Sequence, residues 1–256
     1  MSLILTELND GVFTIRFNRP DKKNSLTQAM YLDLCAALEI AKNDPKTRVL
    51  LFAGQPDCFS AGNDMKDFLN TPPGTATDNP TMKFMFALAE FPKPVVAAPS
   101  GIAVGVAVTM LLHCDLVYCG DKTTLNMPFV NIGIVPEYVS SYLLPRMMGH
   151  VRACELVLLG EPFTAQKALE YGLVNALAPN AEVEALARKK ALAMAQLPPD
   201  TVRHTKSLLK RWRGDITKEA IPFELLEVSK RLKHPEALEA ISSFLQKRKP
   251  DFSRFS

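Results

Sequence analysis

The chain has 256 residues, of which 47% are hydrophobic and 22% are charged, and its formal net charge is +3. A chain of this size and composition is expected to form a globular protein with a full buried core. The charge is too small to argue for nucleic acid as a partner, whereas local basic clusters could still meet a phosphorylated small molecule.

Cysteine and histidine placement argues against a disulfide framework and against a metal centre. No CxxC motif occurs and the four histidines do not cluster, so no metal site is predicted. The amino-terminal apolar run is too short for a signal peptide, and no stretch is long enough to span a membrane. We expect reduced core cysteines and a cytoplasmic location, because the cysteines are odd in number and mostly set in apolar runs. They are Cys35, Cys58, Cys114, Cys119 and Cys154.

The first part of the chain predicts a hairpin, a helix and a buried strand. Residues 3–18 turn at Asp10 and Gly11, a pair that favours a tight turn between two strands. Residues 29–42 carry apolar side chains at helical spacing, and residues 48–53 form a compact apolar strand. A turn-rich loop then leads into a short helix that ends near residue 68.

The middle of the chain continues the alternation of helix and strand. Residues 69–81 are rich in Pro, Thr and Gly and predict a mobile surface loop. A helix over 82–91 and a strand over 95–98 follow. The stretch 99–142 then runs from a small-residue turn through an apolar helix and a short strand to Pro136 and Glu137, which we expect to open another helix. Such repeats predict an α/β fold with parallel strands and right-handed crossovers.

The carboxyl-terminal third is predicted to be helical, with a strand signal only near residues 173–177. We therefore divide the chain into a core domain at 1–195 and a helical region at 196–256 that has a partner to bury against. Helices are predicted over 151–160, 164–171, 181–196, 199–212, 217–232 and 235–247.

Six motifs follow one another along nearly the whole chain. They are FNRPDKKNSL at 17–26, CFSAGNDMKDF at 58–68, KPVVAAPSGIAVGVAV at 93–108, HCDLVYCGDKTTLNMP at 113–128, GEPFTAQKALEYGLVNAL at 160–177 and FLQKRKPDF at 244–252. In this order they resemble the crotonase superfamily of enoyl-CoA hydratases and isomerases. This resemblance implies a crotonase-like spiral of ββα units, a helical trimerisation region, and assembly as a homotrimer or a dimer of trimers. It implies an acyl-CoA thioester as substrate and no cofactor beyond the CoA that the substrate carries.

The resemblance also implies an oxyanion hole. The backbone N–H groups of Asn63 and Val106 would hold the thioester oxygen and stabilise the enolate that forms when a proton leaves the α-carbon. Valine stands at 106 where the family commonly has glycine, but a main-chain donor does not depend on its side chain. The alternative is that the small residues around both positions only permit tight turns and close packing.

The same comparison shows which acids are missing. Family hydratases resemble one another in two glutamates, at the positions that match Thr109 and Phe129, and neither acid is present. The segment from Pro136 to Tyr142 instead resembles the Δ3,Δ2-enoyl-CoA isomerase branch, in which one glutamate, here Glu137, shuttles a proton between C2 and C4. The alternative for Glu137 is an ordinary acidic residue in the first turn of a helix.

Substrate contacts are expected around these loops. Lys22 and Lys23 fall where the family meets the nucleotide end of CoA, while Lys249 and Phe252 would cover the CoA. The alternative is that such lysines are only solvated. The remaining expected contacts to substrate or CoA are Ser60, Ala61, Gly62, Asp64, Met65, Lys66, Gly105, Thr109 and Phe129.

Two other functions stay open from the sequence alone. One is hydration or another crotonase-type reaction, such as a lyase reaction, with an acid that the resemblance does not identify. The other is a noncatalytic module that binds acyl-CoA after loss of the acids at Thr109 and Phe129.

Overall fold

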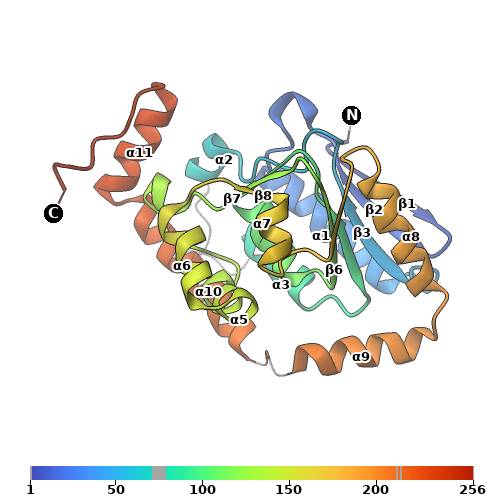
Figure 1. Ribbon diagram of the computed structural model, residues 1–256. Helices are drawn as coiled ribbons and strands as arrows, with labels where there is room; N and C mark the ends of the chain where they lie inside the picture. The colour runs from blue at the N-terminus through green and yellow to red at the C-terminus, as the bar shows by residue number, and fades with distance from the viewer. Residues whose placement is uncertain (1, 71–78, 212, 214, 256) are drawn as a thin grey trace.

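The structure, a computed structural model, describes residues 2–70, 79–211, 213 and 215–255. Six strands form the main sheet in the order β1-β2-β3-β4-β6-β9 (Figure 1). The hairpin β1-β2 is antiparallel and the other neighbours are parallel, as the sequence predicts. The strands are β1 (Ile4–Asn9), β2 (Val12–Phe17), β3 (Val49–Ala53), β4 (Val95–Ala98), β6 (Leu116–Gly120) and β9 (Ala176–Ala178).

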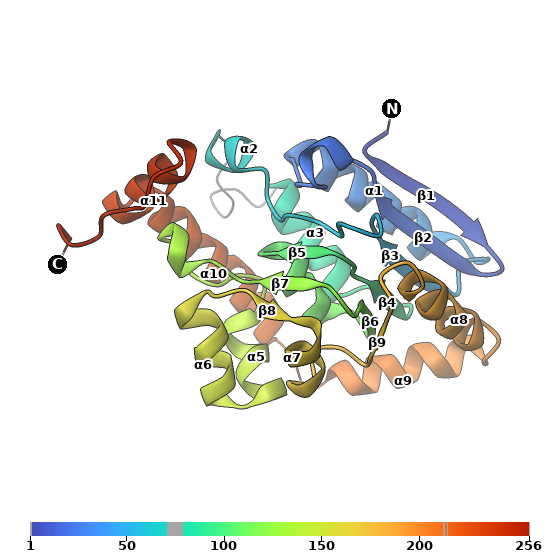
Figure 2. The ribbon, with the colours of Figure 1, turned by 45° about the horizontal axis from the view of Figure 1, so that its top comes forward.

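A second, smaller sheet lies beside the first (Figure 2). It is formed by β5 (Ile102–Val104), β7 (Thr124–Asn126) and β8 (Phe163–Thr164). Ser60 pairs alongside Ala103 of β5, and the Val104 N–H donates to the Ser60 carbonyl at 3.0 Å. Successive passages of the chain thus contribute β4 and then β5, and β6 and then β7, to the two sheets. This is the repeated winding that the resemblance implies.

The inner strands of the main sheet, β2, β3, β4 and β6, bury both faces, because alternate side chains enter two different cores. Leu50 and Phe52 of β3 join the large core beneath α1 (Gln28–Asn43) and α3 (Pro80–Ala89). Val49 and Leu51 face the other way and pack with Ala187 of α8 (Val183–Ala195). The continuous apolar run of β3 is the sequence signal for this double burial.

The carboxyl-terminal third is helical, as predicted, and α11 with the C-terminus lies at the end of the molecule away from the main sheet (Figure 1). The predicted division at residues 195 and 196 stays a prediction. In the described ranges no helix is long and apolar enough to cross a membrane. The other helices are α2 (Met65–Asn70), α4 (Val106–Thr109), α5 (Ser140–Met148), α6 (His150–Leu159), α7 (Ala165–Glu170), α9 (Pro199–Arg211), α10 (Ile216–Leu232) and α11 (Pro235–Leu245), with 3-10 turns η1 (Pro20–Lys22), η2 (Met110–His113) and η3 (Val130–Ile132).

Two predicted elements differ from the structure. The helix expected to open at Pro136 and Glu137 begins only at Ser140, because Tyr138 and Val139 adopt positive φ angles of 65° and 62°, which no α-helix accepts. The apolar helix expected in 99–142 is the short turn α4 continued by η2. Most of the loop predicted at 69–81 lies outside the described residues.

Gly101 permits the turn between the two sheets and gives a stability prediction. It has a φ of 69°, and a Cβ there would lie 1.9 Å from the Asp57 carbonyl oxygen. Gly149 also has a positive φ, 85°, but a Cβ there would meet no atom of the described residues within 4 Å. We expect Gly101→Ala to lower the free energy of unfolding by roughly 1–3 kcal/mol more than Gly149→Ala, because only the first adds a backbone clash to the strain. Urea unfolding followed by circular dichroism measures both, and equal losses would contradict this account.

Candidate active site

A mostly apolar cavity of about 200 Å³ opens where the small sheet meets the carboxyl-terminal helices. Its wall comes from the loop after β3, the β5–α4 turn, the segment around η3, and helices α10 and α11. The lining residues are Ala61, Gly62, Asn63, Met65, Phe68, Thr81, Met85, Val104, Gly105, Val106, Pro128, Phe129, Ile132, Ile134, Glu137, Leu225, Val228 and Ile241.

The loop after β3 is held tightly against β5. The buried Ser60 hydroxyl donates to the Asn24 carbonyl at 2.8 Å and accepts from the Gly62 N–H at 3.1 Å. Gly62 has a φ of 84°, and a Cβ there would lie 2.6 Å from the Val104 carbonyl oxygen. Only glycine fits such an approach, and it brings the chain just before Asn63 beside the chain just before Val106.

The predicted oxyanion donors line this cavity together. In the described part of the chain, neither the Asn63 N–H nor the Val106 N–H has a hydrogen-bond acceptor. Val106 is the first residue of α4, where a helix leaves its N–H groups without intrahelical partners, and Gly105 before it has a φ of 57°. Its side chain is buried, so valine serves at this position as a main-chain donor and a packing residue.

Tyr31 is a supporting residue that the sequence did not reveal. Its fully buried hydroxyl donates to Asn63 Oδ1 at 2.6 Å and fixes the side chain of the first donor. Tyr31 follows Met30 on the apolar face of α1, so its only signal is a hydroxyl among core positions.

Glu137 is a buried carboxylate with one oxygen bonded and one oxygen free. Thr109 Oγ1 donates to Glu137 Oε1 at 2.6 Å. Glu137 Oε2 is buried and has no partner among the described residues, and the side chain lines the cavity. Burial raises the pKa of Glu137 to about 8, the Glu224 carboxylate adds to this rise, and the Thr109 hydrogen bond opposes it. A base with this pKa accepts a proton near neutral pH.

The backbone that carries Glu137 is fixed from several sides. Burial lowers the pKa of His113 to about 3, so its ring is neutral and its Nε2–H donates to the Tyr138 carbonyl at 2.9 Å. The Tyr138 hydroxyl donates to the Met85 carbonyl at 3.0 Å. Glu224 of α10 accepts from the Val139 N–H at 2.6 Å. The alternative of Glu137 as a residue inside the first helical turn is therefore wrong, because the helix begins after these contacts.

Glu224 also escaped the sequence prediction, although a signal for it exists. It lies in the apolar stripe of α10 with Ile221, Leu225 and Val228, which recur at helical spacing. A glutamate inside a buried stripe needs hydrogen-bond partners, and here they are backbone and side-chain donors at the start of α5.

The other residues predicted to contact substrate or CoA lie partly in the cavity wall and partly outside it. Met65 and Phe129 line the cavity, whereas Thr109 lies behind the wall and contacts Glu137. Asp64 pairs with Arg19 at 2.8 Å and accepts from N–H groups at the start of α2. The exposed residues near this loop are Lys22, Lys23 and Lys66.

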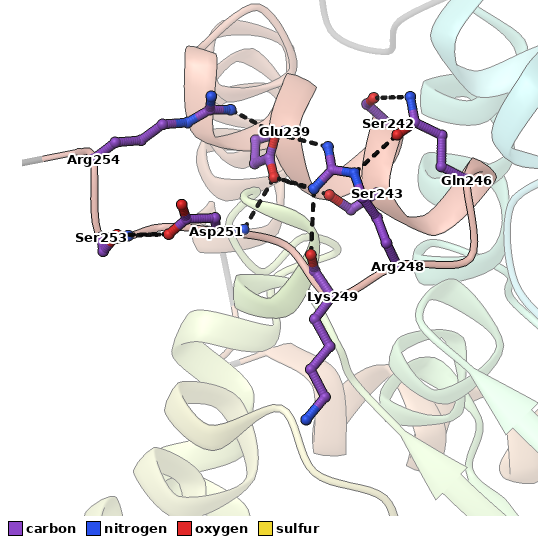
Figure 3. A network of polar contacts seen from close by, with 9 residues as sticks. All are labelled: Glu239, Ser242, Ser243, Gln246, Arg248, Lys249, Asp251, Ser253 and Arg254. Atoms are coloured by element: carbon purple, nitrogen blue, oxygen red, sulfur yellow. Dashed lines mark hydrogen bonds and ion pairs between the residues drawn. The ribbon is translucent and has the colours of Figure 1, made fainter.

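The predicted CoA cover lies in a tail that Glu239 organises (Figure 3). Its carboxylate accepts from Arg248, Arg254 and the Asp251 N–H. Lys249 and Phe252 are both exposed in this tail, and the Lys249 side chain extends away from the network. Neither residue is part of the cavity wall, while Ile241 of α11 is.

Two backbone N–H groups and one carboxylate oxygen without a partner among the described residues face a mostly apolar cavity, and together they form a site of the kind in which enzymes stabilise an oxyanion. A sequence profile described as "Enoyl-CoA hydratase/isomerase" matches residues 7–254. Enoyl-CoA delta isomerase 2 of Rattus norvegicus is 36% identical over 252 residues, which are 96% of this chain and 64% of that protein. This chain thus spans slightly less than two thirds of that relative.

Two further comparisons cover nearly the whole chain. The 2,3-dehydroadipyl-CoA hydratase of Escherichia coli is 30% identical over 98% of this chain and 99% of its own. The structure of Pseudomonas aeruginosa OdaA matches with a TM-score of 0.92 and 46% identity, over 96% of this chain and 99% of that one. The chain therefore belongs to the enoyl-CoA hydratase/isomerase family, the crotonase superfamily. Because relatives include both an isomerase and a hydratase, the reaction has to be argued from the site.

The Thr109–Glu137 hydrogen bond gives a prediction for the site itself. Thr109→Val keeps the shape of the side chain but removes the donor that stabilises the carboxylate, so the pKa of Glu137 should rise above its value of about 8 in the unchanged protein. Infrared difference spectra over pH follow the protonated carboxyl band, and Glu137→Gln assigns it. A Thr109→Val band that titrates at an unchanged or lower pH would contradict the role given to this bond.

Proposed function

We propose that the protein shifts a double bond from Δ3 to Δ2 of an enoyl-CoA, with Glu137 as the single proton-shuttling base. The observation that carries the proposal is the free Oε2 of Glu137. Among the described residues that line the cavity, Glu137 is the only one that ionises. One base suffices for an isomerisation, in which a proton leaves one carbon and returns to another.

The proposed steps balance without a second acid. Glu137 Oε2 takes a proton from C2, and the electron pair moves into the thioester carbonyl to give an enolate. The N–H groups of Asn63 and Val106 stabilise the enolate oxygen. As the enolate collapses, its electron pair forms the double bond between C2 and C3, the C3=C4 double bond breaks, and the electron pair of that bond takes the proton from Glu137 at C4. Thr109 holds Oε1 throughout, which leaves Oε2 to move between the carbons.

The wall of the cavity supports isomerisation over hydration. Of the positions where the resemblance places the two hydratase acids, one is Phe129 in the apolar wall and the other is Thr109, whose hydroxyl is committed to Glu137. Hydration needs a positioned water and two acids, whereas this wall is mostly apolar and carries one acid, which favours exclusion of water from the enolate. The hydratase relative keeps hydration as the alternative, and a water-sized mass gain on a 2-enoyl-CoA would reveal it.

The finer assignments follow from the same proposal. We assign CoA binding to the exposed Lys22, Lys23 and Lys66 near the oxyanion loop.

We expect a homotrimer or a dimer of trimers, because α10 exposes apolar side chains such as Phe223, 65% of which is accessible in the single chain. The cytoplasmic location stays a prediction.

Glu137→Gln tests the base directly. The variant keeps the shape of the side chain but cannot accept the C2 proton, so we expect kcat for conversion of 3-enoyl-CoA to fall by about 10²- to 10⁴-fold. The Kd for a saturated acyl-CoA, measured by calorimetry, should change little. Glu90→Gln, an exposed change outside the cavity wall, is the matched control. Activity within a few-fold of the unchanged protein would refute the assignment, and binding without turnover in the unchanged protein would favour a noncatalytic module.

Lys23→Ala tests the CoA contact through its salt dependence. If Lys23 meets a CoA phosphate, the variant should weaken acyl-CoA binding more at low salt than at high salt, because salt screens exposed charges. Calorimetric titrations at several salt concentrations measure this difference. Lys189→Ala removes another exposed charge, on α8, and should leave the Kd for acyl-CoA unchanged at low and at high salt. A Lys23→Ala effect that does not depend on salt would remove the assignment.

A further inference from the structure

We propose that Glu224 is the positioning residue for Glu137, so that helix α10 of the carboxyl-terminal region sets the place of the catalytic base. The inference rests on the proposed function, since it gives Glu224 a part in the work of Glu137. Glu224 does not line the cavity. It acts through the backbone at Val139, two residues after Glu137.

The contacts of Glu224 converge on one point of the chain. Its Oε2 accepts from the Val139 N–H at 2.6 Å, while its Oε1 accepts from the Ser141 N–H at 3.3 Å and from the Ser141 hydroxyl. Val139 is the N-cap of the nine-residue helix α5, and its own side chain cannot cap. The carboxylate of Glu224 therefore caps α5 from α10, a helix that is distant in sequence. Its negative charge at the N-terminus of α5 also interacts favourably with the dipole of α5.

The capped segment has a backbone conformation that must be stabilised by contacts from other elements. Tyr138 and Val139 both have positive φ angles, and a β-branched valine rarely adopts one. Glu137 directly precedes this pair. Because a strained pair persists only where its surroundings over-determine it, loss of the Val139 anchor would let the segment relax and would displace Glu137 from the cavity.

Four elements hold this segment, among them α3 through the Met85 carbonyl. Helix α10 is the element that the helical carboxyl-terminal region contributes, and it acts through Glu224. Thr109 of α4 bonds the Glu137 side chain, and His113 of η2 bonds the Tyr138 carbonyl. Glu224 bonds the Val139 N–H. The next residue of α10, Leu225, lines the cavity. One turn of one helix thus forms part of the substrate wall and anchors the base.

Glu224 also acts on Glu137 through charge. The ionisable groups that face Glu137 are Tyr31 from α1, Tyr138 from its own segment and Glu224 from α10. The pKa of each buried tyrosine is raised well above its usual value, so both tyrosines are neutral in the working range. The negative charge of Glu224 raises the pKa of Glu137. A neutral residue at 224 should therefore lower it.

The test compares Glu224→Gln with Glu227→Gln, which removes a carboxylate that pairs with Lys230 on the same helix. Glutamine at 224 keeps the size of the side chain but presents an amide NH₂ to one of the donors. We expect kcat to fall about tenfold or more with KM within about twofold, since the base rather than substrate binding is misplaced. The acidic limb of the kcat/KM profile should move to lower pH, and Glu227→Gln should match the unchanged protein in all three values.

Glu224→Asp keeps the charge but shortens the reach, so it should lower kcat without moving the acidic limb to lower pH. This variant carries the test if Glu224→Gln fails to fold, which thermal melting shows. A folded Glu224→Gln protein with unchanged kcat and an unchanged acidic limb would overturn the inference, as would a full-activity Glu224→Asp protein. In either case an inactive Glu137→Gln protein leaves the proposed function intact, whereas an active one would overturn the proposed function itself.

Discussion

The burial of one carboxylate, Glu137, is the constraint on which the site depends. An ionised group without partners is unfavourable inside an apolar wall, and its pKa rises in response. Thr109 partly offsets that rise by donating to one oxygen. The other oxygen is buried and has no hydrogen-bond partner in the part of the chain that the structure describes. The result is a base whose protonated and ionised forms are both accessible near neutral pH, which is what a proton shuttle requires.

The passage of the chain through two sheets positions the two oxyanion donors. The loop after β3 and the turn after β5 are far apart along the chain, but the pairing of Ser60 with Ala103 sets them side by side. The approach of Gly62 to the Val104 carbonyl then brings both donor loops to one cavity. Main-chain donors held by sheet pairing need little reorganisation when charge develops, and this favours stabilisation of an enolate.

Much of this arrangement follows from the sequence, and the rest depends on tertiary contacts. The continuous apolar run of β3 and the periodic helices of the last third are local signals, and the structure confirms them. The start of α5 is different, because Tyr138 and Val139 hold positive φ angles that local propensity disfavours. Glu224 and Tyr31 stabilise the site across long sequence separations, so no local pattern around Glu137 or Asn63 points to them.

The most direct test of a single-base isomerisation is to incubate the protein with 3-enoyl-CoA and with 2-enoyl-CoA in deuterated water and to locate deuterium by mass spectrometry and NMR. We predict interconversion of the two enoyl-CoA isomers, deuterium confined to C2 and C4, and no product heavier by one water. Formation of a 3-hydroxyacyl-CoA, or the absence of both conversion and deuterium exchange, would contradict it.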